Sequence, residues 1–255
     1  MRNPGLEPAT AVVGHSYAPA GAIDTQAADP VHAPPACGEG SGVNAPGSVL
    51  GETEMTQSIP KGARTIDEID LARAQEYALL SVLLAQAPDA TLLARLAQLR
   101  GDASPLGLAH AALAEAASRA SVERLEREYF DLFIGLGRGE LLPYGSYYLS
   151  GFLHERPLAR LRAYLSELRI ERAASEHEPE DHAAILCEIM AGIVGGRLSA
   201  PAGADRELFE HHLAPWLGRF FADLERAEAA DFYRRVGTLG RVLVEIETQA
   251  FALPS

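Results

Sequence analysis

The chain has 255 residues, with 22 Lys and Arg against 35 Asp and Glu, and its formal net charge is −13. This acidity argues against a general nucleic-acid binder, whose surface is basic, and favours a positively charged partner. The longest uncharged apolar stretch, Tyr77 to Ala87, is too short to span a bilayer, which needs about 20 residues. Two cysteines, Cys37 and Cys187, cannot form a disulfide framework and fit a reducing cytosol.

Residues 1–60 differ in composition from the rest of the chain. They hold eight prolines, eight glycines, a single aromatic residue, Tyr17, and a net charge of −5. Such a segment cannot bury enough apolar surface to offset its chain entropy, so we predict a disordered leader. Its start has no continuous hydrophobic run, which argues against a signal peptide. A linker, a peptide motif for a partner, or a true start at Met55 are the alternatives for this segment.

Residues 61–255 have helical hydrophobic spacing throughout and a net charge of −8. A capping box at Thr65–Glu68 predicts a helix over 71–87. Asp89 predicts the cap of a helix over 91–100 that ends at Gly101, and a third helix is expected over 105–117.

Further helix signals continue to the end of the chain. Ser121 begins a helix whose apolar face includes Leu125 and which ends before Gly135. Pro157 and Pro179 each open another, the second ending at 195–196. Two more are expected over 205–227 and 229–251. The prediction is an all-α domain of about eight or more helices spanning residues 61–255.

Several patterns that suggest chemistry have simpler interpretations. His177 and His182 lie five positions apart with a proline between them, so they do not form the zinc-binding HExxH pattern, and we expect no metal. The glycine-rich run 135–139 lacks the Lys-Ser/Thr of a phosphate loop and is typical of a helix end, with phosphate cradling as the alternative. Cys187 lies in an apolar helix row and is expected to be a buried structural thiol. His211-His212 fits a helix-surface pair, or one histidine lining a groove.

Two segments are more unusual. The first joins Tyr129-Phe130-Asp131-Leu132-Phe133 to Leu142-Pro143-Tyr144-Gly145-Ser146-Tyr147-Tyr148, and it predicts core packing at a helix–loop junction or an apolar groove rimmed by tyrosine hydroxyls. The second is Glu178-Pro179-Glu180-Asp181-His182, where three carboxylates crowd a helix N-terminus and fit a well-capped surface helix or a binding site.

These segments resemble the TorD/DmsD family of cytoplasmic chaperones for redox-enzyme maturation. Two motifs carry the resemblance, which covers about residues 120–247: an aromatic-x-x-Leu-Phe motif at Tyr129, Leu132 and Phe133, and a Glu-Pro-x-Asp-His motif ending at Asp181 and His182. The chain departs from the family in its 54-residue leader and in Tyr144, where an indole often follows the proline.

The resemblance implies two helical lobes joined by a hinge near residues 172–180. It also implies a chaperone that binds the twin-arginine signal peptide of a molybdoenzyme precursor and holds the precursor until molybdopterin is inserted. The signal-peptide site would include the following residues: Tyr129, Leu132, Phe133, Pro143, Tyr144, Glu178, Asp181 and His182. The family implies no cofactor of the chain's own, beyond weak guanine nucleotide binding or transient molybdopterin cofactor, and a monomer or dimer.

The residues themselves are compatible with that function. An apolar groove could hold the apolar part of a signal peptide as a helix, and Glu178 and Asp181 could accept hydrogen bonds from its arginines. No nucleophile with its base and orienting group is visible, so we expect no catalysis. The alternatives are a helical nucleotide hydrolase that uses the glycine run, or a non-catalytic assembly scaffold.

Overall fold

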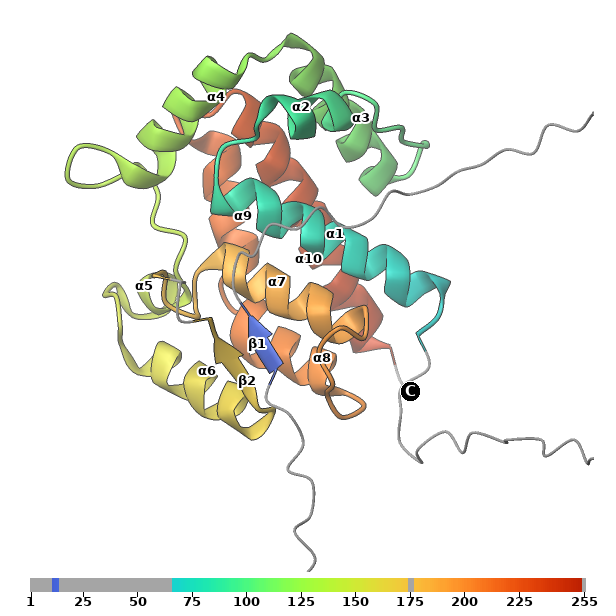
Figure 1. Ribbon diagram of the computed structural model, residues 1–255, viewed down its shortest axis with the longest axis vertical. Coiled ribbons are helices and arrows are strands. Elements are labelled where there is room, and N and C mark those ends of the chain that lie inside the picture. Colours follow the sequence, from blue (N-terminus) through green and yellow to red (C-terminus); the bar gives the residue numbers. More distant parts are fainter. Residues whose placement is uncertain (1–10, 14–65, 174–176, 254–255) are drawn as a thin grey trace, which may run out of the picture. The chain divides into compact units, whose positions relative to one another are not determined.

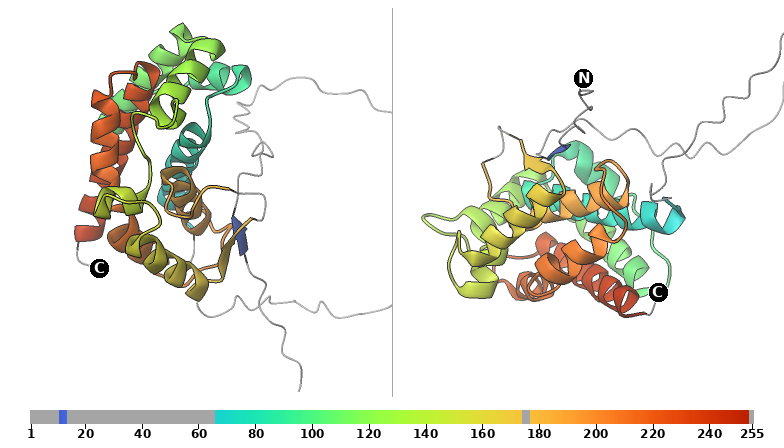
Figure 2. Two further views of the ribbon diagram at one scale, coloured as in Figure 1. Left: turned by 90° about the vertical axis from the view of Figure 1, so that its left-hand side faces the viewer. Right: turned by 90° about the horizontal axis from the view of Figure 1, so that it is seen from below.

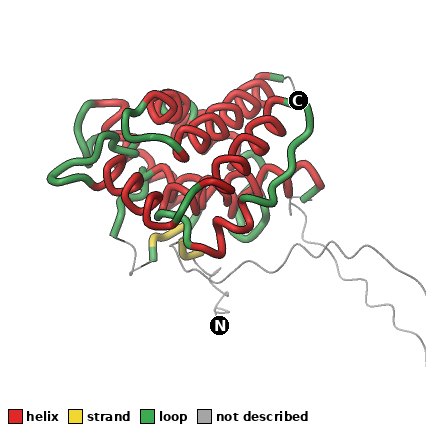
Figure 3. Tube along the Cα trace, turned by 90° about the horizontal axis from the view of Figure 1, so that it is seen from above, coloured by secondary structure: helices red, strands yellow, loops and turns green. Residues whose placement is uncertain are grey.

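The computed structural model describes residues 11–13, 66–173 and 177–253, and the described chain is almost entirely helical (Figure 1). This confirms the predicted all-α class. The two short strands lie together at one edge of the helices (Figure 3). No helix within the described ranges is long and apolar enough to cross a membrane.

The centre of the fold is the helix α7, Ala183–Val194, which packs along α1, Glu68–Ala85. All but one of the residues of α7 are buried, as expected for a helix that is apolar on every side. The cap of α1 is Asp67, whose carboxylate accepts a hydrogen bond from the Asp70 N–H at 2.8 Å. The expected capping residue Thr65 lies outside the described residues.

A second group of helices covers the other side of α1. Helix α2, Ala90–Leu96, begins at the predicted cap Asp89 and is followed by α3, Pro105–Arg119. Helix α10, Phe232–Ala252, packs against α3 and lies next to α9, Leu217–Arg226, as Figures 1 and 2 both show. Gly240 allows this close approach, because a Cβ there would lie 2.3 Å from the ring of Phe221.

Two predicted helices are interrupted by π-helical turns. Helix α4, Val122–Tyr129, widens into η1, Phe130–Ile134. The helix predicted over 205–227 is instead α8, Ala204–Leu208, then η2, Phe209–Leu213, and after a turn α9. Single π turns inside helices are often found at functional sites.

The remaining elements are α5, Gly145–Ser150, α6, Arg156–Glu167, and the strands β1 and β2. Strand β2, Ile170–Arg172, pairs in parallel with β1, Ala11–Val13. The leader was predicted to be disordered, and for these three residues that prediction is wrong: two adjacent valines favour an extended backbone. The rest of the leader, residues 1–10 and 14–60, lies outside the described residues.

The described residues from 66 onward share one hydrophobic core and fall into a single unit. The two lobes implied by the family resemblance therefore do not separate in this structure. Of the expected hinge near 172–180, residues 174–176 lie outside the described residues, and the rest connects β2 to α7.

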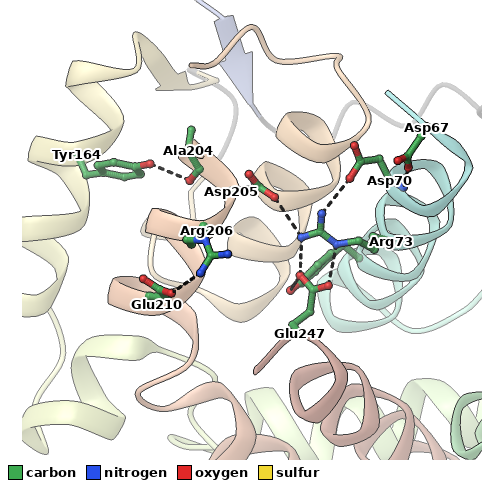
Figure 4. A network of polar contacts seen from close by, with 10 residues as sticks. Asp67, Asp70, Arg73, Tyr164, Ala204, Asp205, Arg206, Glu210 and Glu247 are labelled. Carbon is green, nitrogen blue, oxygen red and sulfur yellow. Dashed lines mark hydrogen bonds and ion pairs between the residues drawn. The ribbon is translucent and has the colours of Figure 1, made fainter. Parts of the chain in front are cut away.

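A buried charge network ties together α1, α8 and α10 (Figure 4). The Arg73 guanidinium donates to both carboxylate oxygens of Glu247, at 2.7 and 2.8 Å, and also to Asp205 at 3.1 Å and Asp70 at 3.0 Å. The Tyr77 hydroxyl donates a hydrogen bond to the Glu247 carboxylate oxygen Oε2 at 3.2 Å. Burial acts to lower the pKa of Arg73, but its bonds and ion pairs with Glu247 and Asp205 outweigh burial and raise that pKa, so the guanidinium stays charged.

Candidate functional site

The aromatic-x-x-Leu-Phe motif lies where α4 turns into η1. Ser121 caps α4, as predicted, by accepting a hydrogen bond from the Arg124 N–H. The π turn ends at Gly135, whose φ is +61° and whose N–H donates to the Phe130 carbonyl at 2.7 Å. A Cβ at Gly135 would lie 2.1 Å from the Arg138 carbonyl oxygen, so the loop that follows η1 requires glycine there.

The motif side chains are mainly packing residues. Leu132 is fully buried, while Tyr129 and Phe133 pack their rings against each other at 5.0 Å and both contact Tyr233 of α10. The Tyr129 hydroxyl donates to the Ala85 carbonyl at 2.8 Å, at the end of α1. Burial, with a smaller contribution from the Glu178 charge, raises the pKa of Tyr129 to about 12. The motif therefore joins α1, α4 and α10.

The Pro143–Tyr144 segment lies across the start of α7. The carbonyl of Pro143 accepts a hydrogen bond from the Ala183 N–H at 2.8 Å, and Tyr144 forms an antiparallel bridge with His182. The two rings of that bridge meet edge to face at 5.0 Å. The structure thus brings the proline turn and the Glu-Pro-x-Asp-His motif together, although they are almost 40 positions apart in the sequence.

This bridge moves the start of α7. We expected the helix to open at Pro179 with Asp181 and His182 in its first turn, but it begins at Ala183. Asp181 and His182 pair with residues 144–145 through their backbone, and His182 is extended, so the helix starts after them. His182 instead caps α7 through Nδ1, which accepts a hydrogen bond from the Ala184 N–H at 3.2 Å.

Asp181 caps a different helix. Its Oδ2 accepts a hydrogen bond from the Ser146 N–H at 2.6 Å, and its carbonyl accepts one from the Gly145 N–H at 2.9 Å, at the start of α5. Asp181 and His182 are only 3% and 6% exposed. Within the described residues, the second Asp181 oxygen, Oδ1, has no hydrogen-bond partner. These two motif residues hold helices in place from beneath the surface.

A small cavity of about 20 Å³ adjoins Asp181 and is also lined by Arg160, His211, His212 and Trp216. Burial, together with the His211 and Arg160 charges, lowers the pKa of His212 to about 4, and its ring stacks on Tyr164. His211 is exposed, as expected of a helix-surface pair, whereas His212 is half-buried, and both line this small cavity.

Glu178 is the exposed acid of the motif. Its carboxylate accepts a hydrogen bond from the Tyr144 hydroxyl at 2.6 Å. Burial, this bond and the Glu178 charge all raise the pKa of Tyr144, so the hydroxyl keeps its proton. Glu178 and Tyr144 therefore form a surface pair directly above the buried Asp181 and His182.

An open groove of about 430 Å³ lies between the loop after η1 and helix α5. Leu142, Tyr147 and Leu149 line it, and Arg138 donates to the Tyr147 hydroxyl at 3.1 Å across it. Tyr148 lines its floor and donates to Asp223 at 3.1 Å.

Several large apolar side chains that are close in sequence to the groove residues are exposed to solvent. Those exposed by 40% or more are Ile134, Leu136, Leu149, Phe152 and Leu153. The sequence did not single them out, because an apolar residue near a helix end is expected to be buried unless the positions of the neighbouring helices are known. Of these, Leu149 lines the groove itself, and exposed apolar surface at a groove is a typical signal of a binding surface.

Other candidate chemistry is not assembled by the fold. Cys187 is fully buried, and burial raises its pKa to about 12, which suits the structural role we expected. Among the described residues, no group of three or more His, Cys, Asp or Glu side chains is arranged to hold a metal ion.

Comparison with known proteins agrees with the motifs. The family model described as nitrate reductase delta subunit matches residues 99–222. The chaperone protein TorD of Vibrio cholerae serotype O1 is 27% identical over 130 residues, covering 48% of this chain and 59% of that protein. A Tat proofreading chaperone, DmsD, of Haemophilus influenzae is 29% identical over 119 residues, covering 46% of this chain and 57% of that protein.

A crystal structure described as a redox enzyme maturation protein from Archaeoglobus fulgidus also matches, with a TM-score of 0.42 and 20% identity, covering 68% of this chain and 92% of that one. The chain spans somewhat less than three fifths of the length of the two curated relatives above. The family and sequence matches confirm the resemblance that the two motifs predicted: the chain is similar to the TorD/DmsD chaperones.

Proposed function

We propose that this chain is a cytoplasmic chaperone for redox-enzyme maturation that binds the twin-arginine signal peptide of a molybdoenzyme precursor. In this proposal it holds the precursor until the molybdopterin cofactor is inserted. The observation that carries the proposal is the groove lined by Leu142, Tyr147 and Leu149, residues that flank Tyr144 in the sequence. The names of the two curated relatives support the same role.

The groove suits the apolar part of a signal peptide. Its walls offer Leu142, Leu149 and the Tyr147 ring, while Phe152 and Leu153 extend the apolar surface past the end of α5. A peptide that folds as an amphipathic helix would bury its apolar face on such a surface. Burying a large apolar side chain contributes about 1.5–3 kcal/mol, part of which offsets the entropy lost on association.

The basic part of the peptide has an acidic neighbour. Glu178 is exposed, so its negative charge could attract a guanidinium of the peptide. Asp181 and His182 are too buried to be reached without opening the helix ends that they cap. Their contribution in this proposal is to hold Tyr144 and Glu178 in position, along with the packing residues Tyr129, Leu132, Phe133 and Pro143.

The proposal includes no catalytic step and no cofactor of the chain's own. The loop 135–139 follows a π turn and has two glycines with positive φ, a helix end of the kind the sequence predicted. Weak guanine nucleotide binding, transient contact with molybdopterin, and a monomeric or dimeric state stay predictions from the family resemblance.

The test is a calorimetric titration of the full chain with a synthetic peptide that carries two adjacent arginines followed by about 12 apolar residues. Phe152→Asp should weaken binding more than tenfold, because it places a charge on the apolar surface. Ile246→Asp is the matched control: Ile246 is 40% exposed on α10, away from the groove, and the affinity should hold.

A second pair of measurements tests the acidic contact. Glu178→Gln should weaken binding of the arginine peptide about threefold to tenfold, and should have no effect on a peptide whose two arginines are replaced by glutamine. Glu207→Gln, at an exposed acid on α8, is the control. Equal affinity of all variants for both peptides would show that the groove is not the signal-peptide site.

A further inference from the structure

The one sheet of the described chain joins two segments that lie far apart in the sequence. Strand β1, Ala11–Val13, pairs in parallel with β2, Ile170–Arg172, and the register places Val12 opposite Glu171 (Figures 1 and 2). Strand β1 also lies against α7. A parallel pair cannot be closed by a tight turn, so this contact is a docking of β1 on the helical body and not a local hairpin.

Strand β2 is held in place by the helical body. Ile170 is 4% exposed and belongs to the hydrophobic core, and the strand contacts α6, which precedes it. Between helix and strand, Arg169 has a φ of +57°, a left-handed conformation that turns the chain sharply at the helix end. Glu171 and Arg172 are exposed. We therefore expect β2 to keep its position at the surface when β1 leaves it.

The hold on β1 is weaker. The strand has three residues, and an isolated pair of strands is at best marginally stable in water. Parallel pairing is also slightly less stable per residue than antiparallel pairing. The contact with β2 is a pairing of main-chain groups, which every residue except proline carries in full. Another extended segment can therefore make the same hydrogen bonds to β2.

We propose that β2 is a docking site for an extended peptide segment of a partner protein, and that β1 covers this site until such a segment displaces it. In this mode of recognition a peptide adds a strand to a sheet edge, and its main-chain hydrogen bonds provide the affinity. The sequence of β1, Ala-Val-Val, shows which chemistry fits: it is uncharged, and valine favours an extended backbone. The partner segment is therefore a run of small and β-branched residues. Strand β2 shares no residue with the groove beside α5, and this site does not depend on the signal-peptide function proposed above.

Hydrogen exchange of the full chain, followed by mass spectrometry, tests whether β1 covers β2. Val12→Pro combined with Val13→Pro removes the N–H on both sides of the strand and should release β1. The amides of residues 170–172 that pair with β1 should then exchange about tenfold faster or more. Val49→Pro with Leu50→Pro, in the leader outside the described residues, is the matched control and should leave this exchange unchanged. Thermal unfolding of each variant checks that the body is folded.

The synthetic peptide Ala-Thr-Ala-Val-Val-Gly-His, which repeats residues 9–15, tests the displacement. It should bind the double proline variant of β1 and slow the exchange of 170–172 again, and it should bind the unsubstituted chain about tenfold more weakly because β1 competes. The same peptide with both valines replaced by proline is the control and should not bind.

Three results would overturn the proposal. Unchanged exchange of 170–172 in the double proline variant would show that β1 does not cover β2. Equal affinity of the peptide for both chains, or no binding to either, would show that β2 is not a site for which β1 competes. A dimer of the unsubstituted chain that the double substitution abolishes, measured by light scattering, would assign the site to β1 of a second copy of this chain instead of a partner protein.

Discussion

Replacing Arg73 by methionine should destabilise the protein strongly. The substitution keeps an apolar stem of similar length but removes the one cation that three carboxylates share. Glu247 is 1% exposed, so its charge would remain in the core without this partner. Breaking a buried ion pair on one side costs about 3–5 kcal/mol. For a folded body of this size, that loss corresponds to a fall in melting temperature of about 6–20 °C.

A double-mutant cycle identifies the source of that loss. Glu247→Gln retains an acceptor for the Tyr77 hydroxyl while removing the charge. The double variant of Arg73→Met with Glu247→Gln should be more stable than the sum of the single effects predicts, by about 1–3 kcal/mol. Urea unfolding of the full chain, followed by far-ultraviolet circular dichroism, measures all four proteins. A cost below about 1 kcal/mol for Arg73→Met, or strict additivity, would refute the argument that this pair is coupled and buried.

Three smaller effects follow from other contacts. The hydrogen bond to Glu76 raises the pKa of His110 above its usual 6.5. The stabilisation from protonated His110 is therefore present below about pH 6.5 and is lost as the pH rises through the pKa of the folded state. His110→Gln should cost more stability at about pH 6 than at about pH 9, as measured by urea unfolding. Tyr129→Phe removes the hydroxyl bond to the end of α1 and should lower the unfolding free energy by about 1 kcal/mol without changing the circular dichroism spectrum. Asp181→Ala leaves the buried Ser146 N–H unpaired and should cost about 1–3 kcal/mol, whereas Asp181→Asn, which retains an acceptor oxygen, should cost distinctly less in the same assay.

The local signals in the sequence were the reliable ones. Asp89 and Ser121 cap helices where predicted, and Gly135 ends one, because each effect depends only on residues within one helical turn. The start of α7 was predicted four residues too early, since it is set by bonds to 143–145, far away in the sequence. Tertiary hydrogen bonds override local capping signals there.

Long-range contacts also explain what was missed. Helix α5 has six residues, and its first N–H groups are satisfied by Asp181, which lies 35 positions later than Ser146. No local pattern announces such a helix. The Arg73 network likewise joins three helices whose charged residues look like ordinary surface residues in the sequence. The predicted site residues form two contact groups, one around Tyr129 and Phe133 and one around Tyr144 and His182. Most of them are packing or capping residues, and the exposed apolar side chains were not among them.

The Glu-Pro-x-Asp-His motif therefore has two physical parts. Its last two residues each cap a different helix, and together they join the start of α5 to the start of α7. Its first residue, Glu178, lies at the surface and accepts a hydrogen bond from Tyr144. Tyr144 belongs to the segment that Asp181 and His182 hold in position. Because the surface pair depends on both helix starts, a change at Asp181 should alter binding through the position of Tyr144, while a change at Glu178 should alter binding directly and leave the stability almost unchanged.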